Sequence, residues 1–425
     1  MHRLSLVLFL GFLGSLAKAT ADSNFNLHFD QSYETYFSAQ ASTYQNTVLN
    51  PGNQYFQFPS EVGEIDFRPD WKFSFLKFHK LVMRPRYLLN SSRTRYTNPT
   101  SETNTARGKF ELTDFFLEDQ WADSLKTVVG LQVYQWGPAE LINPSNPLFH
   151  FNNRQRGAFY KEKGQVLLRA NLDWNKHWGQ VFIFEPISNN EPEWVSRTNF
   201  VQKGLLKTEY RFDNPVNYMG LVVGREELQK SFFGEYLTVS PYEGFSLYTD
   251  ARHTEGLIPY RPQGNIYAGY SLERNDAITS WYTLAVSGLR YEAVNYDLRL
   301  EYVYNEHGLN KEKFAQYLLT IQQLTPDLPN NLVAFAKPGL ELLGQQYLYL
   351  SLRFPNLGKK EDMSLAFRII GSVQDSSAVL QSDFDKNIND HLTAYLEAFT
   401  PSGAKETELN LFGQSFYMVG LKWNL

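Results

Sequence analysis

The chain has 425 residues, no cysteine and a formal net charge of −5. The lack of cysteine excludes a scaffold held together by disulfides, and the mildly acidic balance gives no sign of a nucleic-acid partner. The length suits either two soluble domains or one large barrel. No Pro/Ser-rich linker divides the chain, which favours a single unit. Aromatic residues make up 16% of it, as is typical of membrane barrels and of carbohydrate-binding sandwiches.

Residues 1–19 have the pattern of a secretory signal peptide. Arg3 supplies a basic start, Leu4–Leu16 forms a short uncharged run, and Ala17-Lys18-Ala19 matches a cleavage site. The apolar run is too short to cross a bilayer as a helix. We therefore expect an exported protein in which residues 20–425 form one domain.

Segments with a two-residue alternation follow almost to the end of the chain, beginning at residues 25–40. The clearest is Val294–Asn305, in which apolar side chains alternate with polar ones and Val303 is the only misfit. This period is that of a β-strand with two different faces. Further segments of this kind occur at residues 81–89, 125–134, 165–174, 206–212, 266–273, 347–354, 364–370, 391–399 and 416–425.

The last segment, Phe416–Leu425, places Tyr417, Trp423 and Leu425 on a wholly apolar face. Lipid accepts such a face when every backbone group is paired in a closed barrel. A terminal strand of this kind also resembles the assembly signal of bacterial outer-membrane barrels. The predicted fold is all-β: a transmembrane, antiparallel, up-and-down β-barrel of about 18 strands, within a range of roughly 14 to 18.

Several irregularities interrupt the strands. Pro85 cannot donate a hydrogen bond to a strand neighbour, so we expect a bulge there. Residues 213–217 and 387–390 are rich in turn-forming side chains and predict tight turns. Within one long connection, Asn310–Leu324 has a helical apolar stripe, which predicts a short helix that caps a barrel mouth. The long connections are expected at roughly residues 137–164, 187–202, 251–263 and 306–344.

The most distinctive motif runs from Gly130 to Pro144. A strand leads into Trp136-Gly137, and the loop that follows contains Asn-Pro twice, at Asn143-Pro144 and Asn146-Pro147; both pairs mark turns. The pattern Gly-x-Gln…Trp-Gly followed by Asn-Pro resembles a group of porin-like outer-membrane barrels of Gram-negative bacteria, although no Arg follows the first Gly here. The resemblance implies a channel in which this loop folds towards the lumen and narrows it. A rigid loop that stabilises the rim is the alternative.

Arginine is prominent on the polar faces of the predicted strands. Rows of opposite charge would create a transverse field across a wet pore, and a guanidinium binds carboxylate or phosphate in a bidentate manner. The alternative is that these charges pair with one another and brace the wall. The residues predicted to line or constrict the pore are Arg84, Arg86, Trp136, Asn143, Pro144, Arg169, Arg211, Asp297, Arg299, Glu301, Arg353 and Arg368.

No motif in the chain predicts catalysis. The histidines are scattered without metal-ligand spacing, and no Gly-x-Ser-x-Gly elbow is present. We expect no enzyme activity, cofactor or metal, but a passive outer-membrane channel for small polar or anionic solutes. Its partners would be membrane lipid and solutes, not nucleic acid. The sequence leaves open whether the chain forms a homo-oligomer. The rival hypotheses are a closed barrel for surface adhesion or polysaccharide anchoring, an outer-membrane hydrolase, and a soluble secreted sandwich that binds glycans.

Overall fold

The protein is described here by a computed structural model. It covers residues 27–75, 78–97, 100–149, 162–187, 202–226, 230–256, 261–265, 269–273, 279–323, 342–411 and 413–425. The predicted signal peptide, residues 1–19, lies outside the described residues.

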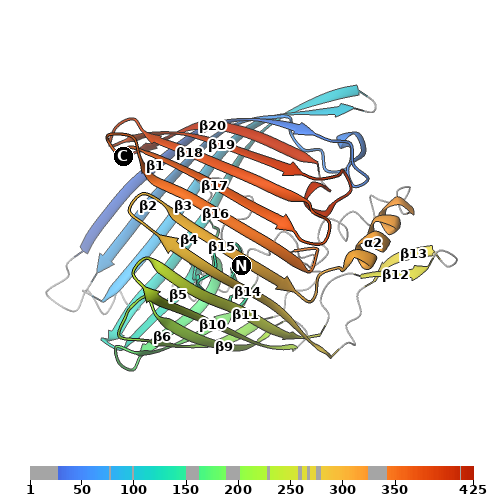
Figure 1. Cartoon of the computed structure of the whole chain (residues 1–425). Coiled ribbons are helices and arrows are strands. Elements are labelled where there is room, and N and C mark those ends of the chain that lie inside the picture. The colour runs from blue at the N-terminus through green and yellow to red at the C-terminus, as the bar shows by residue number, and fades with distance from the viewer. Residues whose placement is uncertain are drawn as a thin grey trace.

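An antiparallel sheet of 18 strands closes on itself to form a barrel (Figure 1). Consecutive strands pair around the ring, and β1 (Leu27–Tyr44) closes it against β20 (Gln414–Asn424). The predicted all-β, up-and-down barrel is confirmed, as is its number of strands. The other barrel strands are β2 (Glu61–Phe75), β3 (His79–Thr97), β4 (Thr100–Ala122), β5 (Leu125–Gln132), β6 (Gln165–Asp173), β7 (Trp178–Glu185), β8 (Lys203–Arg211), β9 (Tyr218–Glu226), β10 (Lys230–Tyr242), β11 (Phe245–Glu255), β14 (Trp281–Glu292), β15 (Asp297–Asn305), β16 (Gln346–Leu357), β17 (Met363–Ser372), β18 (Ala378–Asn387) and β19 (Leu392–Ser402).

The two ends of the barrel differ in the length of their connections. Short turns, such as residues 243–244 between β10 and β11, join the strands at one end. Both predicted tight turns lie at this end, because they follow β8 and β18. The opposite end carries the long connections, at residues 133–164, 186–202, 256–280 and 306–345. Outer-membrane barrels have this asymmetry, with short periplasmic turns and longer extracellular loops.

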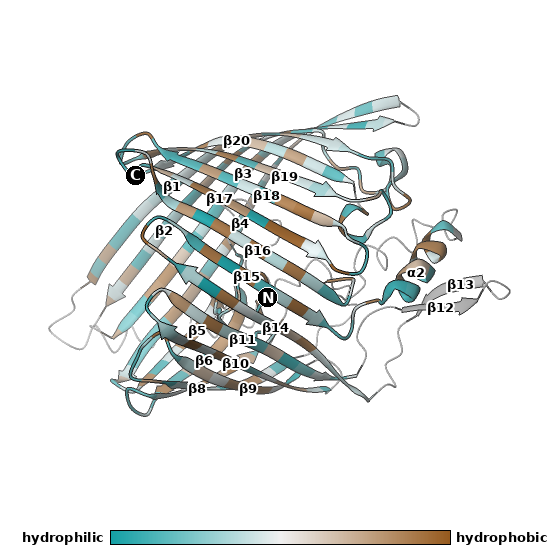
Figure 2. Ribbon diagram, in the orientation of Figure 1, coloured by the Kyte–Doolittle hydropathy of each residue, from teal (hydrophilic) through white to brown (hydrophobic). Residues whose placement is uncertain are grey.

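Side chains alternate between an exposed outer face and a buried inner face. On β15, the outward Leu300 is 42% exposed, whereas the inward Glu301 and Val303 are fully buried. On β20, Tyr417, Val419, Leu421 and Trp423 all face outward. Figure 2 shows the same alternation as hydrophilic and hydrophobic bands along the strands. The outer face is therefore the apolar one, as the sequence pattern predicts.

Two local features test the expected strand assignments. The register between β3 and β4 shifts between Arg84 and Pro85, which confirms the predicted bulge. The prediction of a barrel strand at residues 266–273 is wrong. Gly269–Glu273 forms β13, which pairs with β12 (Arg261–Asn265) in a separate two-stranded sheet, and residues 266–268 lie outside the described residues. Alternation alone does not distinguish a hairpin in a connection from a strand of the wall.

Helix α2 (Lys311–Gln323) lies at the end with the long connections. Its buried Tyr317 and Ile321 pack with Leu49, Leu309 and Leu411, and Leu49 and Leu411 belong to other connections at that end. The helix thus covers part of the mouth, as its apolar stripe predicts. Among the described residues, no helix is long and apolar enough to cross a membrane.

Strands β3 and β4 continue beyond the rim as a two-stranded ribbon (Figure 1). Their pairing extends from His79↔Asp119 to Thr97↔Thr100. The outer part of the ribbon is polar on both faces and includes the ion pair between Arg93 and Glu102.

Candidate solute pathway

The connection between β5 and β6 turns into the interior of the barrel. Its residues from Trp136 to Phe149 are largely buried, and Ile142, Ser145 and Asn146 have no exposed surface. Connections normally run over the surface of a protein. We call Trp136–Phe149 the inward loop, because the inner faces of the barrel strands surround it.

The inward loop owes its shape to the residues of the sequence motif. Gly137 adopts φ +98°, and a Cβ atom there would lie 2.3 Å from Oδ1 of Asn143. Oδ1 of Asn143 accepts the backbone N–H of Ala139 at 2.9 Å. Asn146 accepts the N–H groups of Leu148 and Phe149, both at 3.1 Å, in the next turn. The two Asn-Pro pairs therefore build two successive side-chain-capped turns.

Two wall carboxylates hold the loop in place. Glu301 on β15 accepts the backbone N–H groups of Glu140 and Leu141 at 2.6 and 3.0 Å. Asp250 on β11 accepts the backbone N–H and the hydroxyl of Ser145 at 2.6 and 3.0 Å. The loop is thus fixed to two separate strands of the wall.

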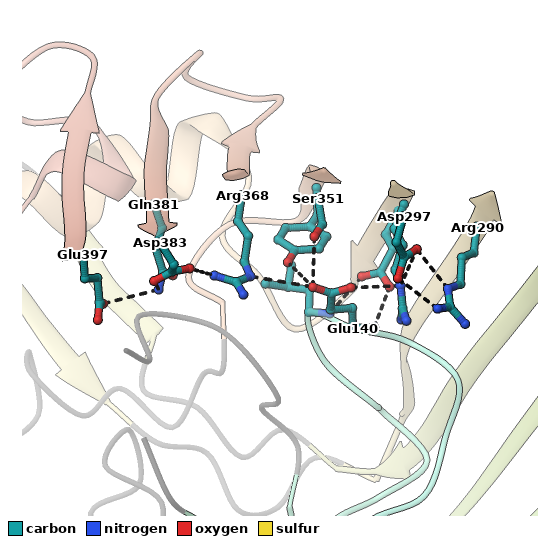
Figure 3. Close-up of polar contacts among 12 residues, drawn as sticks. Glu140, Arg290, Asp297, Ser351, Arg368, Gln381, Asp383 and Glu397 are labelled. Atoms are coloured by element: carbon teal, nitrogen blue, oxygen red, sulfur yellow. Dashed lines mark hydrogen bonds and ion pairs between the residues drawn. The ribbon is translucent and has the colours of Figure 1, made fainter. Parts of the chain in front are cut away.

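Glu140, which projects from the inward loop, lies at the centre of a band of alternating charges (Figure 3). Its Oε2 is 3.0 Å from Nε of Arg299, and its Oε1 is 3.7 Å from Nε of Arg368. Tyr349 and Ser351 on β16 donate their hydroxyl groups to the same carboxylate at 3.1 and 3.0 Å. One loop residue thereby joins the side chains of three neighbouring wall strands.

The band continues on both sides of Glu140. On one side, Arg299 lies 3.7 Å from Asp297, which Arg290 also contacts at 2.9 Å. On the other side, Arg368 pairs with Asp383, and Gln381 donates to both Asp383 and Glu397 at 3.4 Å. Acids and bases therefore alternate across the inner faces of β14 to β18, and Gln381 links the last acid of this series, Asp383, to Glu397 on β19 (Figure 3).

A second charged group lies on the inner faces of β2 to β4. Asp66 receives both Arg68 and Arg86, at 2.6 and 2.7 Å. Arg84 lies between Asp70 and Asp114, at 3.1 and 3.2 Å. Arg84 and Arg86 are the two members of this group that the sequence analysis predicted to line the pore. Their side chains are partly exposed, and both form ion pairs.

Much of the inner wall at β6 to β9 is apolar, and the inward loop covers this part. Trp136, Leu148 and Phe149 of the loop pack against buried aliphatic side chains of β6 to β9, which are Leu167, Val181, Ile183, Leu205 and Val222. On the other side of the loop, Leu141 and Ile142 pack in one cluster with Val303. Val303, the misfit of its strand, is thus apolar because the loop lies against it.

The predicted pore residues fall into different positions. Trp136, Asn143 and Pro144 are buried and shape the loop instead of facing open space, and Glu301 holds it. Arg169 lies over the ring of Tyr134, with 4.2 Å from its Cζ to the ring centroid.

The other two predicted arginines lie away from the inward loop. Arg211 pairs with Glu209 and Asp173 near the short-turn end. Arg353 is exposed and, among the described residues, makes no ion pair. Asp297, Arg299 and Arg368 belong to the band around Glu140.

Sequence reasoning missed Glu140, Asp250 and Asp66 as key positions. Glu140 stands inside the motif, but its wall partners, from Arg299 to Arg368, follow 159 to 228 residues later in the chain. The available signal was the set of apolar side chains on expected inward positions, such as Val128, Leu167 and Val303. They indicate that something inside the barrel covers the wall. No group of metal-ligating side chains occurs in the part of the chain that the structure describes.

Comparison with known proteins finds relatives in structure only. No family model and no curated sequence matches the chain. Among solved structures, OccAB1 of Acinetobacter baumannii has a TM-score of 0.55 at 9% identity, over 93% of this chain and 96% of that one. Two Pseudomonas aeruginosa proteins, OccK5 (OpdH) and OccK7 (OpdD), each have a TM-score of 0.51 at 10% identity. Each match covers 93% of this chain. It covers 98% of the OccK5 chain and 99% of the OccK7 chain. The chain therefore has the barrel fold of these Occ proteins.

Proposed function

We propose that this protein is a Gram-negative outer-membrane channel for the passive passage of small polar or anionic solutes. Residues 1–19 would act as the export signal, and residues 20–425 would form the single barrel domain. Barrels of 16 to 18 strands are wide enough to enclose an aqueous channel. An apolar outer face with exposed aromatic side chains suits contact with lipid. The fold shared with the Occ proteins supports this assignment.

The observation that carries the proposal is the position of Glu140 between Arg299 and Arg368. The inward loop fills the apolar side of the barrel and presents this carboxylate to the charged wall. A solute would then pass between the loop and the charged inner faces of β18 to β20 and β1 to β4. Charges at a constriction select solutes by sign and geometry. We infer no catalytic step and no cofactor for such passage.

Both signs of charge border this route, and the partly exposed arginines can bind carboxylate or phosphate groups. Arg299 and Arg368 are held by acids on the loop and the wall, which fixes their guanidinium groups in place. An anionic solute would therefore pass from one guanidinium partner to the next along the wall, replacing the carboxylate that each arginine contacts. Small polar solutes without charge would meet the same groups as hydrogen-bond donors and acceptors.

Ion currents across planar bilayers test the proposal. Discrete conductance steps are expected for the purified barrel, and Arg299→Glu should move the reversal potential towards cation selectivity. Lys359→Glu, in the exposed turn after β16, is the matched control and should leave selectivity almost unchanged. A folded barrel without conductance would contradict the channel and favour adhesion or polysaccharide anchoring. Hydrolysis of lipid or peptide would favour an enzyme, and recovery without detergent would favour a soluble sandwich.

A further inference from the structure

The outer wall of the barrel contains a concave groove across β5 to β9. Its volume is about 1040 Å³. Strand pairing places two adjacent rows of outward side chains along it. One row passes through Val129, Leu168, Phe184, Gly204 and Arg225, and the next through Thr127, Ala170, Phe182, Leu206 and Val223. Apart from Arg225 and the hydroxyl of Thr127, these side chains are apolar or absent.

Small residues form the floor of the groove between larger neighbours. At Gly204, a Cβ atom would have no other atom within 4 Å, so space is open directly above this backbone. Phe182 and Phe184 on the preceding strand are both exposed and form one wall. The groove is therefore a slot whose width is set by the small residues of its floor. The rest of this outer face is covered by large apolar side chains.

Arg225 stands at one end of the groove, next to the long-connection end of the barrel. It is the penultimate residue of β9, whereas Val129, at the other end of the row, has three further residues of its strand before the connection. Arg225 is exposed and makes no ion pair with any described residue. Glu255, on the same rim, instead accepts the backbone N–H of Ser231 at 3.4 Å. A cationic group thus lies at the rim end of an apolar slot.

We propose that this groove binds a membrane lipid, with an acyl chain in the slot and a phosphate-bearing headgroup at Arg225. The slot offers apolar contact to a flexible hydrocarbon chain, which follows a concave surface more closely than a folded protein does. The guanidinium offers paired donors to phosphate oxygens. An outward arginine at the level of the headgroups is also the position where such a side chain is tolerated in a barrel. The inference rests on the membrane location of the barrel but not on solute passage.

Lipid retention by the purified barrel, measured by native mass spectrometry, tests the proposal. The barrel in neutral detergent is incubated with phosphatidylglycerol or with phosphatidylcholine. The wild type should retain phosphatidylglycerol in preference to phosphatidylcholine. Arg225→Gln should abolish that preference, because the net negative headgroup of phosphatidylglycerol loses its cationic partner, whereas the phosphate of phosphatidylcholine is already balanced by choline and the acyl chain of either lipid keeps its slot. Gly204→Phe should lower the retention of both lipids, because the ring occupies the slot.

Gly63→Phe is the matched control, since Gly63 also faces outward with open space at its Cβ position, on β2 far from the groove. It should retain lipid like the wild type. If Gly204→Phe does not fold, as judged by heat modifiability, Ala170→Leu provides a smaller filling of the same floor. If Gly204→Phe or Ala170→Leu folds and still retains lipid like the wild type, the proposal is overturned. So would complete displacement of phosphatidylglycerol by inorganic phosphate, because the acyl chain would then contribute nothing.

A third result would also overturn it. If filling the groove dissociates an oligomer and leaves lipid retention unchanged, the occupant is a second copy of the chain. Planar-bilayer conductance of the same variants separates this proposal from the channel proposal. Gly204→Phe should conduct like the wild type, because its side chain lies outside the barrel.

Discussion

The carboxylate of Glu301 accepts the backbone N–H of Glu140 at 2.6 Å, although the two residues are 161 positions apart in the chain. Glu301 belongs to the wall and Glu140 to the inward loop. Because Glu301 also accepts the N–H of Leu141, one buried side chain satisfies two consecutive loop donors. The position of the inward loop is therefore set by a wall strand and not by the loop alone.

Glu301→Gln should loosen the inward loop. An amide offers one acceptor oxygen where the carboxylate offers two, so one buried loop N–H loses its partner, at a cost of about 1–3 kcal/mol. Single-channel recordings should show larger conductance and frequent transitions between levels. Glu243→Gln, in the exposed turn between β10 and β11, controls for the loss of one acid. Steady wild-type currents from the Glu301→Gln barrel would contradict the assigned role.

Glu140→Gln should make the pore more selective for anions. The substitution keeps the shape of the side chain but removes the negative charge between Arg299 and Arg368. Reversal potentials in a salt gradient measure the change, which should have the opposite sign to that of Arg299→Glu. Shifts of the same sign in the two variants would place these groups away from the ion path.

Gly137→Ala should displace the start of the inward loop. The backbone there has φ +98°, and the added methyl group would lie 2.3 Å from Asn143 and 2.4 Å from Asp250. Backbone strain of this kind costs about 1–3 kcal/mol, and a displaced Asp250 also loses its hold on Ser145. Increased conductance with a lower thermal unfolding temperature in detergent is expected. Gly63→Ala, where the methyl group meets open space, should alter neither quantity.

Leu300→Arg should impair membrane insertion. Leu300 faces outward in the middle of β15, and a cation at the bilayer midplane of a barrel costs about 2–4 kcal/mol. Unfolding from liposomes in denaturant measures the loss of stability. Leu300→Phe keeps the position apolar and should unfold like the wild type. If the Leu300→Arg barrel were as stable as the wild type, this height of the wall would not be in contact with hydrocarbon.

The period-two pattern predicted the barrel because each strand carries the information about its own two faces. On β15, the alternation of Leu300 with Glu301 already indicates which face of the strand meets apolar surroundings. The sequence signals for the bulge at Pro85 and for helix α2 are also local. A missing backbone N–H and an apolar stripe each determine structure within a few residues. These features could be read without knowing the rest of the fold.

The arrangement inside the barrel could not be predicted in the same way. Alternation indicates that Glu301 points inward, but not whether it meets water or a loop. The contacts of Glu140 with Arg299 and Ser351 depend on how far the loop reaches across the interior, which no short stretch of sequence specifies. The same limit led to the wrong assignment of residues 266–273, because a hairpin in a connection has the alternation of a wall strand.

The ribbon formed by β3 and β4 has a practical consequence. Hydrophilic on both faces and paired as far as Thr97 and Thr100, it stands clear of the rim without contributing to the wall at its tip. Exposed polar tips tolerate inserted sequence well. Under the proposed outer-membrane location, with the long connections outside the cell, a short foreign epitope placed between these two threonines would be held away from the barrel. Antibodies on intact cells would then reach it while the wall assembled undisturbed.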